Sequence, residues 1–234
     1  MEKIVCVAGP TASGKTRLAV ELAKAYDGEV LSCDSMQIYR GMAIGTAAPT
    51  PEEMQGVKHY LVNELEPDEE FNVVVFQRLC KQYMEQIYAE GRIPIIVGGT
   101  GFYIQSILND IDFTENEADT SYRQILEERA KTQGVQSLHA ELCRVDEKAA
   151  EQIHPNNVKR VIRALEYYHQ TGEKISEHNE SQRQKNSPYD FIYYVLRLPR
   201  EILYDRINRR VDLMREQGLE AEVRRLREQG CTRN

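Results

Sequence analysis

Residues 4–16 read Ile-Val-Cys-Val-Ala-Gly-Pro-Thr-Ala-Ser-Gly-Lys-Thr, a short apolar run followed by a glycine-rich loop. The apolar part, Ile4–Ala8, is typical of a buried strand, and the pattern G-x-x-x-x-G-K-[ST] at Gly9–Thr16 leads into a helix expected over Gly14–Tyr26. Glycines in such a loop let successive backbone N–H groups surround an anion, and the amino-terminal end of the helix adds its positive dipole. The stretch therefore predicts a phosphate-binding loop between a strand and a helix, against the alternative of a glycine-rich turn with no ligand.

Two side chains of this loop have chemistry of their own. The Lys15 ammonium places a positive charge against phosphate oxygens, and the Thr16 hydroxyl suits Mg²⁺ as a ligand. The residues expected to bind phosphate are Gly9, Pro10, Thr11, Ala12, Ser13, Gly14, Lys15 and Thr16. Kinases, NTPases and some transferases share such a loop, so it predicts a phosphate ligand and leaves the reaction open.

Length and composition are those of an ordinary globular protein. The 234 residues, 41% hydrophobic and 29% charged, are enough to bury a substantial core as one domain or as one domain with an insertion. No apolar run reaches the length of a membrane span, and the N-terminus leads directly into the first expected strand, so we expect no membrane contact and no signal peptide. The five cysteines form no C-x-x-C pair, which is typical of reduced thiols in the cytoplasm. Because the net charge is −7, nucleic acid would have to bind to a local basic face.

Strand-like and helix-like segments alternate through the first half of the chain. We expect strands over Ile4–Ala8, Glu29–Cys33, His59–Asn63 and Ile93–Val97. We expect helices over Gly14–Tyr26, Val73–Glu90 and Phe102–Leu108. The last of the strands is apolar throughout, as strands buried on both faces of a parallel sheet are. The alternation predicts an α/β fold, a P-loop NTPase-like doubly wound parallel sheet that binds ligands at the carboxyl ends of its strands.

The pattern changes near Thr114, after which the chain is charged and helical. Four helices are expected there, over Ser121–Thr132, Val135–Val145, Glu147–Gln152 and Asn157–His169, followed by a polar loop over Gly172–Pro188. A strand over Phe191–Leu198 then returns to the sheet, and a basic helix begins near Arg200. We therefore expect residues 1–113 and 191–234 to form the α/β core and residues 114–190 to form an inserted all-helical subdomain.

Polar side chains follow two of the expected strands. Asp34 and Ser35 follow one strand and Thr100 follows another, so we expect all three at the sheet edge that carries the phosphate loop. Asp34 has three interpretations: a ligand of Mg²⁺, a general base for an acceptor nucleophile, or the cap of a loop. Thr100 could hydrogen-bond a leaving group or only close its turn. The strand before Thr100 ends in glycines rather than in an acidic metal ligand, which argues against an ATPase or a GTPase.

Four blocks of sequence occur in an order that is found in a known family. They are Gly-Pro-Thr-Ala-Ser-Gly-Lys-Thr at 9–16, Ser-Cys-Asp-Ser-Met-Gln-Ile-Tyr at 32–39, Val-Gly-Gly-Thr-Gly at 97–101, and Ile-His-Pro-Asn-Asn at 153–157 with Arg-Ala-Leu-Glu at 163–166. Together they resemble the bacterial tRNA dimethylallyltransferases, over nearly the whole chain. The resemblance implies transfer of a dimethylallyl group from dimethylallyl diphosphate to the N6 amine of an adenosine beside the tRNA anticodon, with Mg²⁺ and with release of diphosphate.

The resemblance also implies roles for individual residues. The phosphate loop would hold a diphosphate that leaves, and such a loop implies nucleotide binding, ATP included. Asp34 matches the general base that accepts the amine proton, and Thr100 matches a residue that hydrogen-bonds the diphosphate. Lys15 would stabilise the charge of the leaving group. Arg206 and Arg210, which share one face of the basic helix, match arginines that close over the diphosphate, against the alternative of a solvated cationic stripe.

A tRNA-binding surface is implied in the same way. Positions 34–37 match a segment that faces the adenine, and parts of the helical insertion match segments that contact tRNA. The implied contacts are Asp34, Ser35, Met36, Gln37, Thr100, Arg123, Lys159, Arg160, Val161, Ile162 and Arg163. The insertion would act as a clamp on the anticodon stem-loop, although its basic residues considered by spacing alone also fit a solvated surface.

Other activities stay open at this point. A small-molecule or nucleotide kinase would use the same loop for ATP, a related type of prenyltransferase would modify free adenine nucleotides, and a non-catalytic protein would only bind diphosphate or RNA. Members of the family usually continue with further helices past the position of Asn234. We expect this chain to bind diphosphate, and full tRNA affinity and turnover to depend on such helices. We further expect a monomeric, cytoplasmic enzyme.

Overall fold

The computed structural model describes residues 1–113 and 120–231, which belong to two compact units. One unit contains residues Met1–Asp110 and Ser187–Asn234, and the other contains residues Ile111–Asn186. The sequence placed the insertion at residues 114–190, a few residues later at each boundary. No helix in the described ranges is long and apolar enough to span a membrane.

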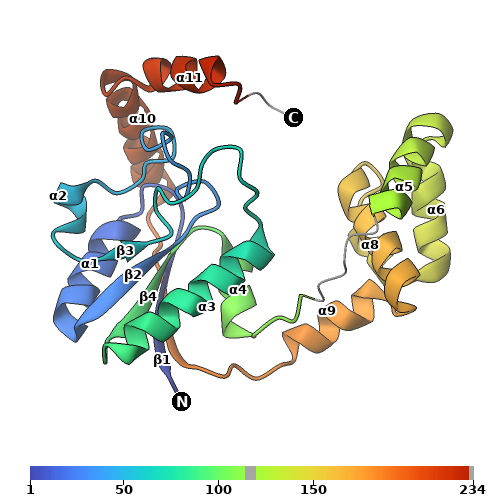
Figure 1. Cartoon of the computed structure of the whole chain (residues 1–234), viewed down its shortest axis with the longest axis horizontal. Coiled ribbons are helices and arrows are strands. Elements are labelled where there is room, and N and C mark those ends of the chain that lie inside the picture. Colours follow the sequence, from blue (N-terminus) through green and yellow to red (C-terminus); the bar gives the residue numbers. More distant parts are fainter. Residues whose placement is uncertain (114–119, 232–234) are drawn as a thin grey trace. The chain divides into compact units, whose positions relative to one another are not determined.

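A five-stranded parallel sheet forms the centre of the first unit (Figure 1). Its order is β3–β2–β4–β1–β5, so the first strand lies inside the sheet and later strands are added on both sides of it. The strands are β1 (Lys3–Ala8), β2 (Gly28–Cys33), β3 (His59–Tyr60), β4 (Ile93–Gly98) and β5 (Asp190–Val195). This order confirms the doubly wound α/β fold predicted from the alternation of strands and helices, although β3 is shorter than the expected His59–Asn63.

Helices cover both faces of the sheet, and β4 shows why. Ile95 and Val97 pack with Ala19 on one face, whereas Ile96 packs with Phe76 on the other. Successive side chains of a strand point to opposite faces, so an apolar run buries both of them. The helices of this unit are α1 (Lys15–Tyr26), α2 (Pro51–Met54), α3 (Val73–Ala89), α4 (Gly101–Leu108), α10 (Arg200–Glu216) and α11 (Leu219–Glu228).

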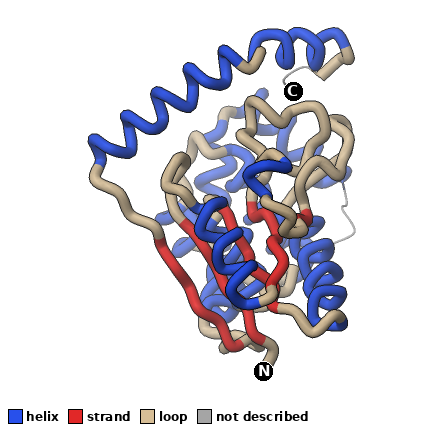
Figure 2. The backbone as a smooth tube through the Cα atoms, turned by 90° about the vertical axis from the view of Figure 1, so that its left-hand side faces the viewer, coloured by secondary structure: helices blue, strands red, loops and turns tan. Residues whose placement is uncertain are grey.

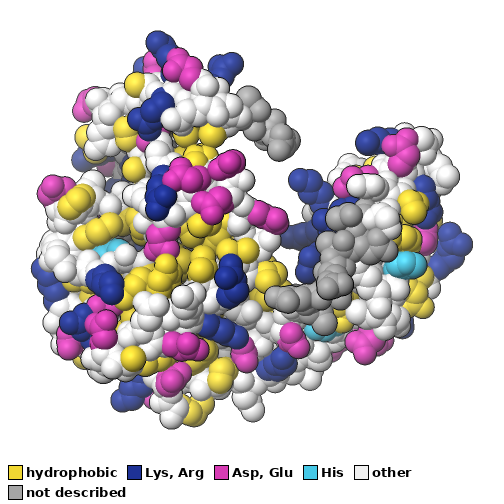
Figure 3. Space-filling model, viewed as in Figure 1, with side chains coloured by type: hydrophobic (Ala, Val, Ile, Leu, Met, Phe, Trp, Pro, Cys, Tyr) yellow, Lys and Arg dark blue, Asp and Glu magenta, His cyan; other side chains and the backbone are white. Residues whose placement is uncertain are grey.

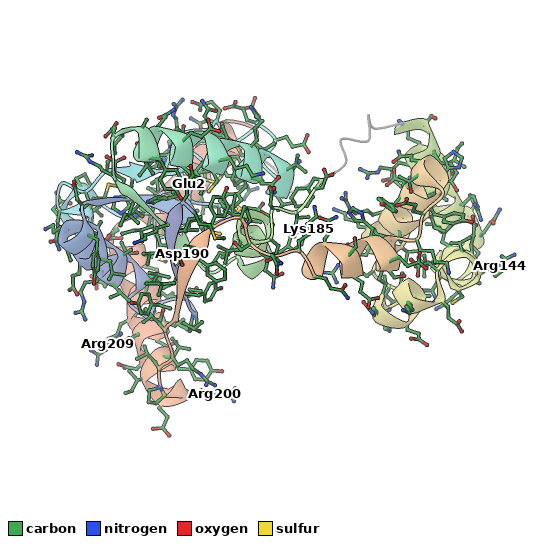
Figure 4. The ribbon with its side chains drawn as sticks, turned by 90° about the horizontal axis from the view of Figure 1, so that it is seen from below. Glu2, Arg144, Lys185, Asp190, Arg200 and Arg209 are labelled. Carbon is green, nitrogen blue, oxygen red and sulfur yellow. The ribbon has the colours of Figure 1, made fainter. Side chains whose placement is uncertain are left out.

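The last strand, β5, lies at one edge of the sheet and is exposed along its whole length. It begins beside β1, where the Asp190 amide donates to the Glu2 carbonyl at 2.9 Å (Figure 4). After Val195 the chain passes through a loop into α10 (Figure 2), and this helix has no buried residue. The strand is shorter than the expected Phe191–Leu198 because its neighbour β1 ends at Ala8, which pairs with Val195.

The second unit has a core of its own. Its helices are α5 (Thr120–Gln133), α6 (Val135–Val145), α7 (Glu147–Gln152), α8 (Val158–Thr171) and α9 (Ile175–Arg183). Leu126, Leu138, Leu142 and Leu165 are buried together at its centre. The unit therefore does not depend on the sheet for its apolar burial.

One prediction in this region is wrong: residues 175–183 form α9 within the expected polar loop Gly172–Pro188. Gly172 ends α8 in the left-handed conformation, and the buried Asp146 carboxylate then holds the start of α9. It accepts hydrogen bonds from the Ser176 amide at 2.9 Å and the Ser176 hydroxyl at 2.6 Å. Because this partner lies 30 residues earlier, a local pattern of polar residues did not reveal the helix.

Candidate functional site

The loop after β1 has the backbone geometry of an anion site. Ala12 and Gly14 both adopt positive φ angles, 63° and 95°, and the Ser13 amide donates back to the Pro10 carbonyl at 3.3 Å. Left-handed residues between right-handed ones turn successive N–H groups toward a common point, where an anion binds. A positive φ in alanine is strained, and strain of this kind gathers at functional sites.

A buried hydroxyl in the same loop supports this interpretation. Ser13 is buried, and its Oγ has no hydrogen-bond partner within the described residues. A buried polar group without a partner is costly, and an oxygen-rich ligand in the loop would supply one. Gly9 keeps the loop close to the sheet, since a Cβ there would lie 3.0 Å from both Ser13 Oγ and the Leu196 carbonyl oxygen.

Three charged side chains from three elements act on one another beside the loop. Lys15, at the start of α1, donates from Nζ to the Pro10 carbonyl at 2.9 Å. Burial lowers the pKa of Lys15, the positive charge of Arg210 on α10 lowers it further, and the Asp34 carboxylate after β2 raises it. Lys15 is therefore within electrostatic range of Arg210 and Asp34, and the two positive charges favour an anion at the loop.

Other arginines of α10 do not share this position. Arg206 is exposed one turn before Arg210. Arg200 donates to the Tyr204 hydroxyl, and Arg209 pairs with Asp205 at 3.2 Å on its own helix; both arginines point away from the sheet (Figure 4). Of the two arginines expected to close over a diphosphate, Arg206 and Arg210, it is Arg210 whose charge acts on Lys15 of the loop.

The register of the sheet places Asp34 beside the phosphate loop. Cys33 of β2 and Ala8 of β1 both pair with Gly98 of β4, so the residues that follow these strands lie at one edge. Asp34 Oδ1 accepts hydrogen bonds from the amides of Met36 at 2.9 Å and Gln37 at 3.3 Å. Asp34 therefore caps its own turn. Within the described residues Oδ2 has no hydrogen bond, so this capping leaves it available to another group.

Thr100 lies at the same edge, at the N-cap of α4. Its carbonyl accepts from the Cys33 thiol at 3.6 Å, and its hydroxyl makes no capping hydrogen bond. The strands approach closely here, since a Cβ at Gly98 would lie 2.0 Å from the Cys33 carbonyl oxygen. Burial raises the pKa of Cys33 well above that of an ordinary thiol, so Cys33 packs as a small protonated side chain. Within the described part of the chain the Thr100 hydroxyl makes no hydrogen bond, so it is available to donate to a ligand.

The segment at 34–37 does not present all four of its side chains. Gln37 donates from Nε2 to the carbonyls of Thr46 at 3.3 Å and Ala47 at 3.1 Å, and its Oε1 accepts from the Ser32 hydroxyl at 2.8 Å. Gln37 was expected to face the substrate, yet its amide is used inside the protein. Met36 is the exposed member of the segment. Sequence reasoning missed these bonds because they join residues that have no fixed spacing.

In the helical unit, α8 separates the predicted tRNA contacts into two groups. Lys159, Arg160 and Arg163 are exposed, and they form no ion pair within the described part of the chain. Val161 and Ile162 are buried in the core of the unit, so their side chains hold the helix in place and do not reach a ligand. Of these predicted contacts on α8, only the three basic side chains lie on the surface of the unit.

Arg123 has a different environment from that basic group. Its guanidinium donates to both carboxylate oxygens of Glu166, at 2.9 and 2.8 Å. Glu166 is buried, and a buried carboxylate requires such a partner. Arg123 therefore joins α5 to α8, and a contact with RNA at this position would use a guanidinium that is already anchored.

Comparisons with known proteins agree on one family. A family model described as IPP transferase matches residues 37–234. The tRNA dimethylallyltransferase of Lachnoclostridium phytofermentans is 58% identical over all of this chain and 75% of that protein. The one from Acetivibrio thermocellus is 50% identical over 98% of this chain and 74% of that protein. The chain thus spans about three quarters of the length of these curated relatives.

Solved structures give the same result. The full-length tRNA isopentenylpyrophosphate transferase of Bacillus halodurans is 45% identical, with a TM-score of 0.67 over 99% of this chain and 72% of that one. A eukaryotic dimethylallyltransferase acting on tRNA is 33% identical, with a TM-score of 0.86 over 97% of this chain and 56% of that one. The similarity therefore covers both the sequence and the fold.

Proposed function

Because the chain belongs to the IPP transferase family, we propose that it transfers a dimethylallyl group from dimethylallyl diphosphate to the N6 amine of an adenosine beside the tRNA anticodon. Its curated relatives are named tRNA dimethylallyltransferases, which makes the chain a tRNA-modifying prenyltransferase. One observation supports the assignment to its own residues: the phosphate loop, Asp34 and Thr100 converge at one edge of the sheet. This arrangement supports the activity expected for the family at one site of the α/β fold.

The reaction breaks the bond between the allylic carbon and the diphosphate oxygen, whose electron pair leaves with the diphosphate. Backbone N–H groups of the loop and the positive charges of Lys15 and Arg210 would stabilise the negative charge that develops on the diphosphate. The Thr100 hydroxyl donates to the same leaving group. These residues therefore act as the diphosphate site.

Asp34 acts on the acceptor. The N6 lone pair forms the new bond to the allylic carbon, and the proton that N6 loses passes to Asp34 Oδ2. The turn bonds to Oδ1 hold the carboxylate in place for this transfer. An adenine amine is a weak nucleophile, so alignment beside the donor supplies much of the rate. The adenine must leave its stack to enter, which costs about a few kcal/mol, and less in a single-stranded loop.

Mg²⁺ fits the donor set of the loop. Thr16 offers a hydroxyl at the start of α1, and the unpartnered Ser13 hydroxyl lies nearby in the same loop. The described residues contain no group of three His, Cys, Asp or Glu side chains that could hold a metal by themselves. The ion would therefore bind through Thr16 and the phosphate oxygens of the donor, as Mg²⁺ commonly does. When bound, it neutralises charge on the diphosphate.

The basic residues of α8 would bind the anticodon stem-loop, and the helical unit would act as its clamp. Their exposure and lack of ion pairs within the described chain support this role. We also propose that the enzyme acts as a monomer, and that it acts in the cytoplasm, where its tRNA substrate would be found. The loop would also accept nucleotide phosphates such as those of ATP.

One assay separates this function from its alternatives. The protein is incubated with labelled dimethylallyl diphosphate and with tRNA, AMP or ATP, and the products are resolved. Label in tRNA supports the proposal, and label in AMP identifies a prenyltransferase of free nucleotides. Transfer of phosphate from ATP identifies a kinase, and binding without turnover identifies a protein that only recognises diphosphate or RNA. Each of the last three results contradicts the proposal.

A further inference from the structure

The C-terminal helix α11 is fastened to a loop far away in the sequence. The Glu222 carboxylate accepts hydrogen bonds from the amides of Ile44 at 3.0 Å and Gly45 at 2.8 Å. Arg225, one turn later, donates to the Gly41 carbonyl at 2.8 Å. These contacts join parts of the chain that are 177 to 184 residues apart. The loop over residues 41–47 is thus held from outside by one helix.

Glu222 is unusual on this helix. It is 5% exposed and is the buried residue of α11, whereas the neighbouring acidic residues Glu220 and Glu228 are exposed. Figure 3 shows acidic and basic side chains together on the outer surface of this helix. A carboxylate is costly to bury unless it is hydrogen-bonded, and two backbone N–H groups supply bonds of the strong, charge-assisted kind.

Gly45 gives the contact its close fit. A Cβ at this position would lie 3.2 Å from Glu222 Oε1 and 3.3 Å from Leu219 Cδ1. Both approaches are tighter than ordinary van der Waals contact, so a side chain at position 45 would displace the ends of the Glu222 and Leu219 side chains by a few tenths of an ångström. Its φ angle is not positive, so the backbone itself would accept alanine. A substitution of Gly45 therefore perturbs the contact alone.

A chain of hydrogen bonds leads from this contact to the acceptor side of the site. The carbonyls of Thr46 and Ala47, directly after the amides bound by Glu222, accept from the Gln37 amide. Gln37 in turn donates its backbone N–H to Asp34 Oδ1 at 3.3 Å. The loop is also braced internally, because the Thr46 hydroxyl donates to the Met42 carbonyl at 2.8 Å. Movement of the loop would therefore be transmitted to the turn that carries Asp34.

From these contacts we infer that Glu222 is a positioning residue for the acceptor adenine. It fixes the 41–47 loop, the loop fixes Gln37, and Gln37 fixes the turn from which Asp34 receives the amine proton. Within the described residues the hydrogen bonds of Glu222 go to the 41–47 loop and none goes to residues 9–16, so we expect Glu222 to act on acceptor alignment and to leave donor binding unchanged. This inference rests on the proposed function for its kinetic part and on the hydrogen bonds alone for its structural part.

The test compares two variants, Glu222→Gln and Gly45→Ala, with the wild type. Glu228→Gln is the matched control for Glu222→Gln, because it removes the same charge at an exposed position. We expect kcat with tRNA to fall by roughly ten- to hundredfold in the first two variants, as loss of a charged hydrogen bond predicts. The KM for dimethylallyl diphosphate and the affinity for inorganic diphosphate should change less than about twofold. The double variant should lose no more than the worse single one, because both changes break one contact. The control should match the wild type.

Hydrogen exchange supplies a readout that does not require turnover. In Glu222→Gln, amides of residues 36–47 should exchange faster, while those of residues 9–16 keep their protection. Unchanged exchange in residues 36–47 would overturn the inference whatever the enzyme does. Faster exchange with unchanged kcat would overturn the link to the acceptor. Absence of prenyl transfer by the wild type would instead count against the proposed function, with the exchange result still deciding the role of Glu222.

Discussion

Asp34 uses its two carboxylate oxygens for different purposes. Oδ1 caps the turn after β2 by accepting from the amides of Met36 and Gln37. The capping interpretation, one of three left open by the sequence, is therefore correct for one oxygen and compatible with base catalysis by the other. A carboxylate held in this way needs no reorientation when the amine arrives.

Replacing Asp34 with asparagine separates these purposes. Asp34→Asn keeps a carbonyl oxygen for the cap but removes the proton acceptor, so we expect kcat to fall by about 10²–10⁴-fold with little change in donor affinity. Steady-state kinetics with tRNA and equilibrium binding of the donor provide the measurements. A strong loss of donor affinity would reassign Asp34 to metal binding.

Lys15 predicts how donor binding depends on pH. Burial and the charge of Arg210 lower its pKa below that of an ordinary lysine, and the raising effect of Asp34 is smaller. As the pH rises, Lys15 loses its proton earlier than an ordinary lysine, so diphosphate affinity should decline on the alkaline side. Bound diphosphate favours the charged form, so binding there should take up a proton. Titration calorimetry in buffers of different ionisation enthalpy measures this uptake, and Lys15→Arg should abolish it. Affinity that is constant up to the ordinary lysine range would contradict the prediction.

At the scale of elements, α8 shows how one helix serves two surfaces. Val161, Ile162 and Leu165 fill the core of the helical unit, and the basic residues lie on the exposed side. Amphipathic spacing alone explains the buried side, and the exposed side needs no explanation in terms of stability. A functional role for the basic group therefore has to be tested by binding.

Removal of all three charges provides that test. In Lys159→Ala/Arg160→Ala/Arg163→Ala, we expect tRNA affinity to fall and the slope of log affinity against log salt to become shallower by about two, because fewer counterions are released. Diphosphate affinity should be unchanged, since the phosphate loop lies in the other unit. Filter binding at several salt concentrations measures both quantities. An unaltered affinity and slope would show that this face does not bind tRNA.

At the scale of the whole molecule, each unit has its own core. Leu108, before the insertion, and Tyr189, after it, pack in the same cluster of the first unit. The two ends of the insertion are therefore held together by the sheet unit itself. This arrangement is typical of a domain inserted into another, which can be removed without opening its host.

Replacing residues 111–186 with a short glycine-rich linker should therefore leave the sheet unit folded. We expect a cooperative thermal transition and diphosphate affinity within a few-fold of the full chain, together with loss of tRNA binding. Circular dichroism and calorimetry provide the measurements, and Lys15→Ala in the shortened chain is the control for specific binding. An unfolded product would show that the units form one cooperative structure.

Much of this site could be read from local patterns. The structure contains three features where they were expected: the glycine-rich loop, the apolar strands before it and before Thr100, and Asp34 directly after β2. Each depends on backbone requirements of neighbouring residues. The sequence predicted one basic helix, whereas the structure has two, α10 and α11. The helix is interrupted at Gly218, whose φ of 98° is not helical. Helix α9 was overlooked because its anchor, Asp146, belongs to another helix.

The amino-acid sequence by itself determined the fold class, the phosphate loop and the family, because periodicity and loop chemistry act between residues a few positions apart. Tertiary structure alone decided which charges meet: Arg210 with Lys15, Arg123 with Glu166, and Glu222 with the amides of the 41–47 loop. Such pairs depend on how separate elements pack. Burial strengthens the interaction between two charged groups because it removes the water that would otherwise solvate them.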